Sequence, residues 1–175
     1  MRAWLVLMLM LPLAAAAQTP GFDYNSGDHA SRAEKPVALP PYPKPENYLP
    51  FQVSDTMPFD FFVDAKSISV SADHQVVRYT LIAKSSDGAL NISYEGMRCS
   101  DGEFRIYAFG QRDKTWFKVR NPKWEVIRKN PRNAQRAVLY NNFFCPVIGG
   151  GIASAEEGVR ALKAGGNPRA AITSY

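Results

Sequence analysis

The sequence has few of the residues that build metal sites and dense disulfide scaffolds. It contains two cysteines and two histidines among 175 residues. Two cysteines form at most one disulfide, which excludes a disulfide-dense miniature fold. A zinc site needs about four closely spaced ligands, and His29 and His74 lie far along the chain from Cys99 and Cys145. We therefore expect no metal site, and the length allows one domain of ordinary size.

The sequence also lacks an apolar run long enough to span a membrane. The longest run, Ala3 to Ala17, has about 15 uncharged residues, whereas a transmembrane helix needs about 20. A positive charge at Arg2, an apolar stretch and a small-residue end are typical of a secretory signal peptide, here residues 1–17. We predict cleavage near the end of this run, a mature chain that begins at Gln18, and export to the periplasm. The first cysteine is Cys99, so no lipobox is present and no lipid anchor is expected.

Export bears on the state of the two cysteines. Outside the cytoplasm paired cysteines are oxidised, so Cys99 and Cys145 are predicted to form a disulfide. The bridge would close a loop of about 46 residues and stabilise the fold by about 4 kcal/mol on the chain-entropy model. Two free buried thiols or a metal-binding pair are the alternatives that the sequence leaves open.

Prolines and apolar residues divide the chain into segments. Seven prolines lie between positions 20 and 50, where apolar residues are few. Such a stretch favours disorder and stiff, polyproline-like backbone. It either lies along its own domain, held by Leu49 and Phe51, or is a docking ligand for a partner. The predicted segments are a disordered leader (18–38), an extended Pro-rich tether (39–51), an α+β domain (52–168) and a flexible tail (169–175).

Alternating apolar residues and hairpin turns predict an antiparallel sheet. In the clearest strand Val77, Tyr79 and Leu81 share one face, and Asp87-Gly88 behind it is a strong hairpin signal. A β-bulge is expected at Gly96. The periodic runs predict a meander of about six strands, drawn from residues 59–63, 68–70, 76–84, 90–99, 104–109, 116–119 and 124–127.

Helices are predicted to follow the sheet. Asn133 can cap a short helix that runs from Ala134 to Phe144. Ser154 and Glu157 form a capping box, and the helix that they open ends at Gly165-Gly166. The predicted fold class is therefore α+β: a single antiparallel sheet with one or two C-terminal helices, joined by one disulfide.

No pattern identifies a catalytic or cofactor-binding site. The run Gly149–Ser154 precedes a helix, but serine holds the third glycine position and too little chain follows for a dinucleotide-binding unit. Glu156 and Glu157 are interpreted as helix-start residues, where the helix dipole favours negative charge. Asp60 and Asp64 are interpreted as turn residues. We predict a non-enzymatic protein without a cofactor.

One alternative hypothesis is kept, in which the protein is an enzyme. A small hydrolase that acts on cell-wall or lipid material would need a site assembled in space, and Asp73 and His74 are the pair around which it would form. A buried His74 in a deep pocket would favour this alternative.

The segment from Arg105 to Arg136 carries a strong excess of positive charge. It has ten basic residues and two acids, a net charge of +8. Such a stretch indicates a polyanionic partner. An exported protein seldom meets nucleic acid, so the expected partners are lipopolysaccharide, anionic lipid or peptidoglycan, or an envelope protein. The alternative is a solvated face that only keeps the protein soluble. The predicted binding surface consists of Arg105, Arg112, Lys114, Trp116, Lys118, Arg120, Lys123, Trp124, Arg128, Lys129 and Arg132.

Several blocks of the sequence resemble one known family. The blocks include Leu49-Pro50-Phe51, Phe61-Phe62-Val63-Asp64, Tyr94-Glu95-Gly96 with Arg98-Cys99, Tyr107-Ala108-Phe109-Gly110 and Phe143-Phe144-Cys145-Pro146. In these blocks, and over roughly residues 37–168, the chain is similar to the cryptic neisserial protein one-like family. The resemblance implies an exported, envelope-located protein with no assigned activity and no catalytic residues to carry over. Family members are often described as lipoproteins, and this chain departs from them in lacking a lipobox cysteine.

A weaker similarity is to the surface-adhesin E family. That family places one cysteine at a strand end and the other after a C-terminal helix, as Cys99 and Cys145 are placed here. The similarity implies a sheet-plus-helix fold with a bridge.

Overall fold

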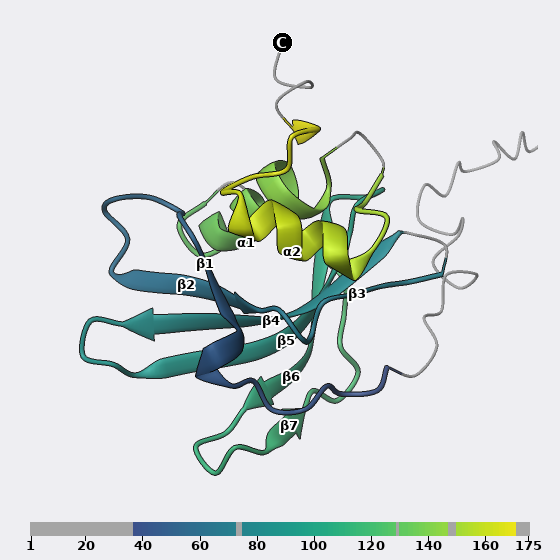
Figure 1. Cartoon of the computed structure of the whole chain (residues 1–175). Coiled ribbons are helices and arrows are strands. Elements are labelled where there is room, and N and C mark those ends of the chain that lie inside the picture. Colours follow the sequence, from purple (N-terminus) through teal and green to yellow (C-terminus); the bar gives the residue numbers. More distant parts are fainter. Residues whose placement is uncertain (1–36, 73–74, 129, 147–149, 171–175) are drawn as a thin grey trace, which may run out of the picture. The chain divides into compact units, whose positions relative to one another are not determined.

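A long antiparallel hairpin forms the centre of the sheet (Figure 1). β4 (Val76–Ser85) pairs with β5 (Leu90–Arg98) along nearly its whole length. The turn between them closes at Gly88, whose φ of +88° lies in the left-handed region that glycine adopts without a steric penalty. Its amide donates to the Ser85 carbonyl at 2.9 Å. The hairpin predicted from Asp87-Gly88 is confirmed.

The computed structural model describes residues 37–72, 75–128, 130–146 and 150–170, which belong to one unit, Val37–Tyr175. Some predictions fall on other residues. The signal peptide, the leader up to residue 36, the pair Asp73 and His74, Lys129, Gly149 and the tail beyond residue 170 lie outside the described residues.

The remaining strands join the hairpin on both sides. In the described residues the sheet has eight antiparallel strands in the order β1-β2-β4-β5-β6-β7, with β3 paired to β4 and β8 paired to β6. The antiparallel sheet predicted from the sequence is thus confirmed. The other strands are β1 (Tyr48–Phe51), β2 (Phe59–Asp64), β3 (Ser69–Val70), β6 (Glu103–Gly110), β7 (Trp116–Lys118) and β8 (Glu125–Val126).

The last strand does not extend the meander. β7 pairs with the Ala108–Gly110 end of β6, whereas β8 returns to the opposite end and pairs with Glu103 and Phe104. The amide of Ile127 continues this contact by donating to the Gly102 carbonyl at 2.8 Å. The loop between β7 and β8 therefore runs back along β6 instead of turning outward, and it does so past Asn121, which has a φ of +55°.

The end of the Pro-rich segment belongs to the sheet. The sequence analysis ended the tether at residue 51, but Tyr48–Phe51 is the edge strand β1, paired with β2. Pro50 is tolerated there because an edge strand can leave one N–H position unpaired. A short 3₁₀ helix, η1 (Pro45–Asn47), precedes it.

The predicted bulge lies one step from its expected place. The register between β5 and β6 shifts between Tyr94 and Glu95, so that Tyr107 is the extra residue on β6. Gly96 has a different role, because a Cβ there would lie 2.4 Å from the hydroxyl oxygen of Tyr107. The glycine thus makes room for the Tyr107 ring, which packs against Tyr94 with ring centroids 5.6 Å apart.

The first predicted helix is shorter and more irregular than expected. The α-helix α1 (Ala134–Leu139) passes into a π-helical segment, η2 (Tyr140–Phe144), which ends with a bond from the Cys145 amide to the Tyr140 carbonyl at 3.0 Å. The Asn133 side chain makes no capping bond to the backbone. It accepts a hydrogen bond from Arg136 at 2.9 Å instead, so the predicted cap is wrong.

The second helix, α2 (Ala155–Lys163), begins and ends as predicted. The Ser154 side chain accepts from the Glu157 amide at 3.3 Å, while the Glu157 carboxylate accepts from the Ala153 amide at 2.8 Å. At the other end Gly165 has a φ of +77°, and the amides of Gly165 and Gly166 bond back into the last turn. This is the glycine-ended C-cap that the sequence indicates.

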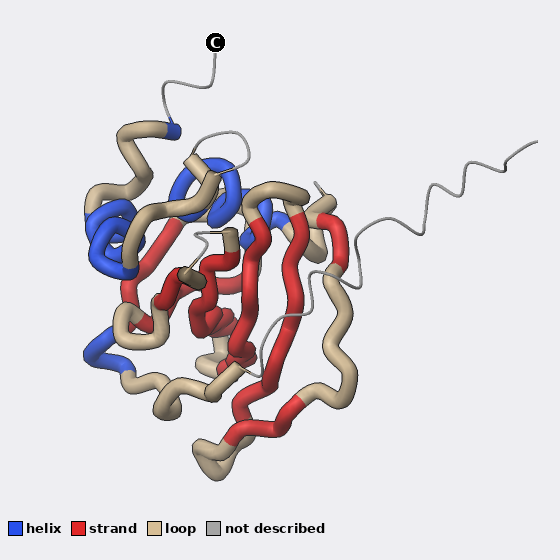
Figure 2. Tube along the Cα trace, turned by 90° about the vertical axis from the view of Figure 1, so that its right-hand side faces the viewer, coloured by secondary structure: helices blue, strands red, loops and turns tan. Residues whose placement is uncertain are grey.

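α1, η2 and α2 cover one face of the sheet (Figure 1), and in Figure 2 they lie together above and beside the strands. Leu139, Phe144 and Leu162 from this layer form one core cluster with Tyr79 and other residues of β4 and β5. The disulfide joins the two layers: Cys99 follows β5, Cys145 follows η2, and their Cα atoms are 5.3 Å apart. The predicted pairing is confirmed, and both cysteines are in the bridge.

The Pro-rich segment covers the opposite face. Val37 and Leu39 pack against a small cluster that includes Tyr94 and Tyr107. Trp116 of β7 donates its indole N–H to the Pro40 carbonyl at 2.9 Å. In the described residues the segment therefore contacts its own domain, the first of the two interpretations above.

A buried ion pair ties α1 to the sheet. Glu95 of β5 is fully buried and accepts two hydrogen bonds from the Arg136 guanidinium, at 2.8 Å from Nε and 2.7 Å from Nη2. Ser93 donates to Oε1 at 2.6 Å, and Tyr79 donates to Oε2 at 3.3 Å. Arg136 also stacks over the Phe104 ring, 4.2 Å from its centroid. The carboxylate is thus paired and hydrogen-bonded on both oxygens.

Candidate functional site

Among the described residues, the carboxylates of Asp60, Glu156 and Glu157, which were weighed as catalytic candidates, are either exposed or hydrogen-bonded within the fold. Asp60 is exposed on β2 and Glu156 is exposed at the start of α2. Glu157 is held by the Ala153 amide and by the side chains of Asn167 and Arg169. Among the described residues no group of three or more His, Cys, Asp or Glu side chains is placed to hold a metal ion.

Asp64 departs from its interpretation as a turn residue. It is the last residue of β2 and is only 3% exposed. Its carboxylate Oδ1 accepts a hydrogen bond from the Lys66 amide at 3.4 Å. Burial, aided by the negative charge of Glu46, raises the pKa of the Asp64 carboxyl, although the Lys66 amide and the Ser67 hydroxyl oppose the shift. The folded state therefore holds the proton of this carboxyl more tightly than the unfolded chain does.

Replacement of Asp64 by asparagine is expected to stabilise the protein at neutral pH. Because the folded state raises the pKa, the ionised carboxylate weakens folding above the unfolded value and has no effect where both states are protonated. The gain of Asp64→Asn should therefore vanish as the pH falls below the ordinary carboxyl range. Thermal unfolding at pH 7 and pH 3 measures it. Asp60→Asn, at the exposed start of the same strand, is the control, and an equal gain from both would contradict the explanation.

The predicted basic surface extends along β6. Arg112 and Lys114 lie in the turn between β6 and β7, and Lys118, Arg120 and Lys123 follow it, all exposed. The exposed Arg128 and Arg132 come after β8, which pairs with the other end of β6. β6 spans about 23 Å at roughly 3.3 Å per residue. The cations are therefore spread along the strand, and those of the β6–β7 turn lie far from those that follow β8.

Two members of the predicted surface are engaged within the fold. The Trp124 ring contacts two guanidinium groups, with Arg98 4.1 Å and Arg105 4.5 Å from its ring centroid. Arg98 in turn forms ion pairs with Asp101 and Glu103, both at 3.2 Å. This stack fastens the segment before β8 to the sheet, so Arg105 and Trp124 have structural partners.

Trp116 is also held, and it positions a second aromatic residue. Besides its bond to Pro40, its ring packs against Tyr42 at 5.4 Å and against Tyr94 at 6.2 Å between centroids. Tyr42 donates its hydroxyl to the Gln111 carbonyl at 2.9 Å. Burial and the nearby Asp113 carboxylate raise the pKa of Tyr42, which keeps its hydroxyl protonated as the donor.

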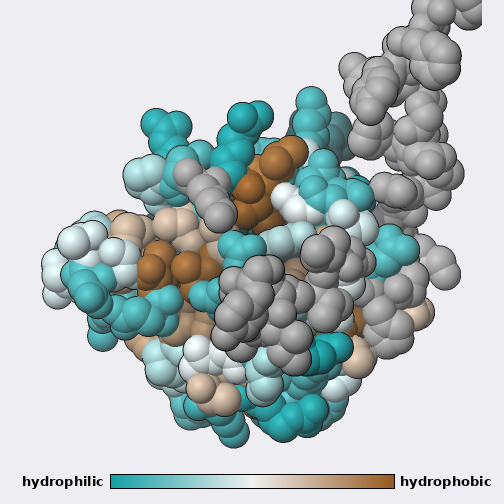
Figure 3. All heavy atoms as spheres, turned by 90° about the horizontal axis from the view of Figure 1, so that it is seen from above, coloured by the Kyte–Doolittle hydropathy of each residue, from teal (hydrophilic) through white to brown (hydrophobic). Residues whose placement is uncertain are grey.

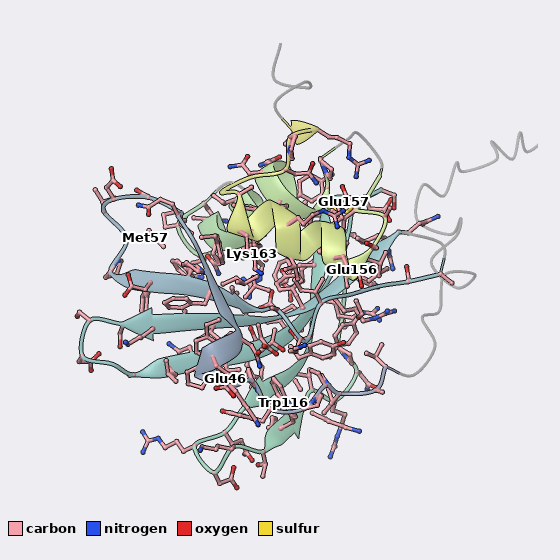
Figure 4. The ribbon with its side chains drawn as sticks, viewed as in Figure 1. Glu46, Met57, Trp116, Glu156, Glu157 and Lys163 are labelled. Atoms are coloured by element: carbon pink, nitrogen blue, oxygen red, sulfur yellow. A yellow bond between two sulfur atoms is a disulfide. The ribbon has the colours of Figure 1, made fainter. Side chains whose placement is uncertain are left out.

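These contacts border a groove of about 1060 Å³, which we call the hairpin groove. We call the segment 42–48 with η1 one wall of the groove, the start of β5 its floor, and the turn between β6 and β7 its far wall. Figure 4 shows Glu46 on η1 and Trp116 on β7, both on the side of the sheet away from α2. The groove is lined by Tyr42, Pro43, Lys44, Pro45, Glu46, Tyr48, Ala89, Leu90, Asn91, Ile92, Gly110, Gln111, Arg112 and Lys114.

The charges of the hairpin groove are mostly positive. Its lining includes three cations, Lys44, Arg112 and Lys114, and one acid, Glu46. Lys114 has a φ of +62°, a conformation that side chains other than glycine, asparagine and aspartate seldom adopt. Asp113 beside it accepts hydrogen bonds from Thr115, which lower its pKa. The turn between β6 and β7 thus carries two cations, Arg112 and Lys114, on a backbone that is held by hydrogen bonds.

Gly110 permits the two walls to meet. A Cβ at this position would lie 2.9 Å from the Ile92 Cβ and 2.9 Å from the Tyr42 hydroxyl oxygen. Any larger residue would therefore push Tyr42 away from the Gln111 carbonyl. The groove depends on a glycine that the sequence analysis did not single out.

The hairpin of β6 and β7 also exposes apolar surface. Phe109 and Phe117 are direct cross-strand neighbours, 44% and 59% exposed. A second hollow, of about 710 Å³, lies on the helix side, where Figure 3 shows apolar surface. It is lined by apolar residues such as Phe51, Met57 and Phe143, and its lining includes no cation.

The sequence identified only part of this site. Arg112 and Lys114 belong to the predicted surface, but Lys44, Tyr48 and Leu90 were not singled out. Together the five residues come from three segments, 44–48, 90 and 112–114, which are distant in sequence and are brought together by the sheet. The run of prolines was the signal available for one wall, since stiff extended backbone near a basic segment can form a groove edge.

Comparisons with known proteins identify a family. The CNP1-like family matches residues 28–163, well over half of the chain, so the protein belongs to this family. The match brings no activity with it. Neither the curated proteins nor the solved structures give a match. In the part of the chain that the structure describes, no helix is long and apolar enough to cross a membrane.

Proposed function

We propose that this member of the CNP1-like family is an exported, non-catalytic module that binds an anionic component of the cell envelope at the hairpin groove. The observation that carries the proposal is the placement of Lys44, Arg112 and Lys114 around one concave surface. Concave sites with a few converging polar groups are the usual form of ligand pockets. Cations on a fixed frame lose little freedom when an anion binds.

Export is part of the proposal. The family membership and the disulfide are consistent with it, because a structural disulfide persists in an oxidising compartment. Lipopolysaccharide phosphates, anionic lipids and peptidoglycan carboxylates are the polyanions of that compartment. An envelope protein with an acidic surface is the other partner that the charge favours.

Co-sedimentation with outer membrane and with peptidoglycan sacculi, at low and at raised salt, tests the proposal. We expect retention at low salt and its loss on adding salt, since exposed charges are screened over about 10 Å at 0.1 M. The variant Arg112→Gln/Lys114→Gly removes two cations, and glycine suits the positive φ at position 114. At about 1 kcal/mol for each cation near an anionic surface, affinity should fall about thirtyfold.

The matched control is Arg128→Gln/Arg132→Gln, which removes the same charge at the other end of β6. It should be retained nearly as well as the parent protein. Equal losses from the two double variants would mean that net charge alone acts, and retention that neither variant changes would refute the proposed site.

A further inference from the structure

We infer that the ligand of the hairpin groove is an anionic amphiphile: a lipid whose acidic headgroup lies at Arg112 and Lys114 and whose acyl part lies over the groove floor. The inference rests on the proposed function and narrows its ligand class. It excludes a purely hydrophilic polymer as the preferred ligand.

The floor of the groove is aliphatic. Leu90 and Ile92 lie two residues apart on β5, on the face away from the helices, and Leu90 is 48% exposed whereas Ile92 is buried. On the Pro-rich wall Pro45 is exposed and adds apolar surface, whereas Pro43 is buried. Exposed aliphatic surface in a concave site gains free energy when an apolar ligand covers it, in proportion to the area removed from water. A sugar or a free phosphate offers little apolar area to this floor.

The aromatic rings of the walls are already used for packing. Tyr42 packs on Trp116, and Tyr48 packs on Phe62 with centroids 5.8 Å apart. The Tyr42 hydroxyl is also committed to the Gln111 carbonyl. The groove therefore has less to offer a glycan, which is typically held by stacking and hydroxyl contacts, than an acyl chain, which needs only apolar surface.

The charges place the headgroup. Arg112 and Lys114 extend from the turn that closes one side of the groove, and Lys44 faces it from the Pro-rich wall. The acidic residue of the groove lining is Glu46. It lies on η1, near Tyr48 and Asp64, and not on the turn between β6 and β7 that carries the two cations. An anion is attracted to the turn, and its apolar part is left over Ile92 and Leu90. A second copy of this chain would bring like charges to the same turn and is disfavoured.

Titration of the protein with three monomeric probes tests the inference. The probes are dihexanoyl phosphatidylglycerol below its critical micelle concentration, dihexanoyl phosphatidylcholine, and glycerol phosphate as the headgroup alone. Calorimetry or backbone amide shifts report binding. We expect phosphatidylglycerol to bind at least tenfold more tightly than either of the other two.

Two single variants test whether lipid binding depends on the floor of the groove or on any exposed apolar side chain. Leu90→Ser should weaken phosphatidylglycerol binding at least fivefold and leave glycerol phosphate unchanged. Phe117→Ser, which removes a more exposed apolar side chain outside the groove, should behave as the parent protein. Both side chains are exposed, so neither variant should prevent folding.

The outcomes distinguish the two proposals. If glycerol phosphate binds as tightly as the lipid, the groove is an anion site without an acyl subsite, and the inference fails while the proposed function stands. If sacculi retain the protein but no lipid binds, the ligand is a hydrophilic polymer and the inference fails. If neither lipids nor envelope material bind, both fail.

Discussion

Replacement of Arg136 by methionine is expected to destabilise the fold by about 3–5 kcal/mol, the effect of removing one partner of a buried ion pair. Glu95 is fully buried, and the variant would leave its carboxylate with only the Ser93 and Tyr79 hydroxyls as donors. Two charged hydrogen bonds would be lost, together with the contact between the guanidinium and the Phe104 ring. Urea unfolding of the variant and the parent protein measures the difference.

Two further variants make this expectation specific. Glu95→Gln/Arg136→Met removes both charges while the amide oxygen still accepts from the neighbouring hydroxyls, so it should regain more than half of the loss. Arg132→Met removes an exposed arginine four residues earlier and should stay within about 0.5 kcal/mol of the parent protein. A cost below about 1 kcal/mol for Arg136→Met would mean that water reaches the Glu95 carboxylate.

Arg136 also shows where the sequence was insufficient. It was counted among the ten basic residues that give the segment 105–136 its net charge of +8, although the predicted binding surface did not include it. Its partner, Glu95, lies 41 residues away in sequence, on a strand whose sequence pattern is that of an ordinary half-buried strand. A charge pair of this kind is visible only when the fold brings the two residues together, so charge counting overstated the exposed basic surface.

Local signals were reliable where one short segment decides the structure. The Asp87-Gly88 turn, the capping box at Ser154 and the glycine end at Gly165 were predicted, because backbone conformation at each site depends on residues a few positions apart. The disulfide was predicted for another reason: two cysteines allow only one pairing, and the predicted signal peptide indicates an oxidising compartment.

Non-local packing decided what was missed. β8 returns to the start of β6, and just before it the Trp124 ring contacts Arg98 of β5 and Arg105 of β6, which are distant from it in sequence. The hairpin groove depends on Gly110, where a Cβ would collide with residues of β5 and of the Pro-rich segment. Trp116 was predicted to face a partner, and its indole N–H faces the chain's own Pro40 carbonyl. The hydrophobic periodicity of the sequence gives no signal for these long-range contacts.

Removal of the disulfide is the other change with a large expected effect. The double variant Cys99→Ala/Cys145→Ala should lose about 4 kcal/mol of stability, because a cross-link between residues 46 positions apart restricts the unfolded chain. The unfolded chain of the variant would be more expanded, so its urea m-value should rise. Reduction of the parent protein should give the same loss, and reduced protein as stable as oxidised protein would contradict the expectation.

The disulfide and the ion pair act on the same part of the fold. Arg136 of α1 forms the ion pair with Glu95 of β5. The Tyr140 hydroxyl donates to the Cys99 carbonyl at 2.9 Å, and Cys145, which follows η2, forms the disulfide with Cys99. Because neighbouring interactions are not independent, Arg136→Met in the disulfide-free protein should cost less than in the oxidised one if the helical layer already detaches without the bridge. A typical domain has only about 5–15 kcal/mol of stability. The loss of either interaction should therefore take a large share of it.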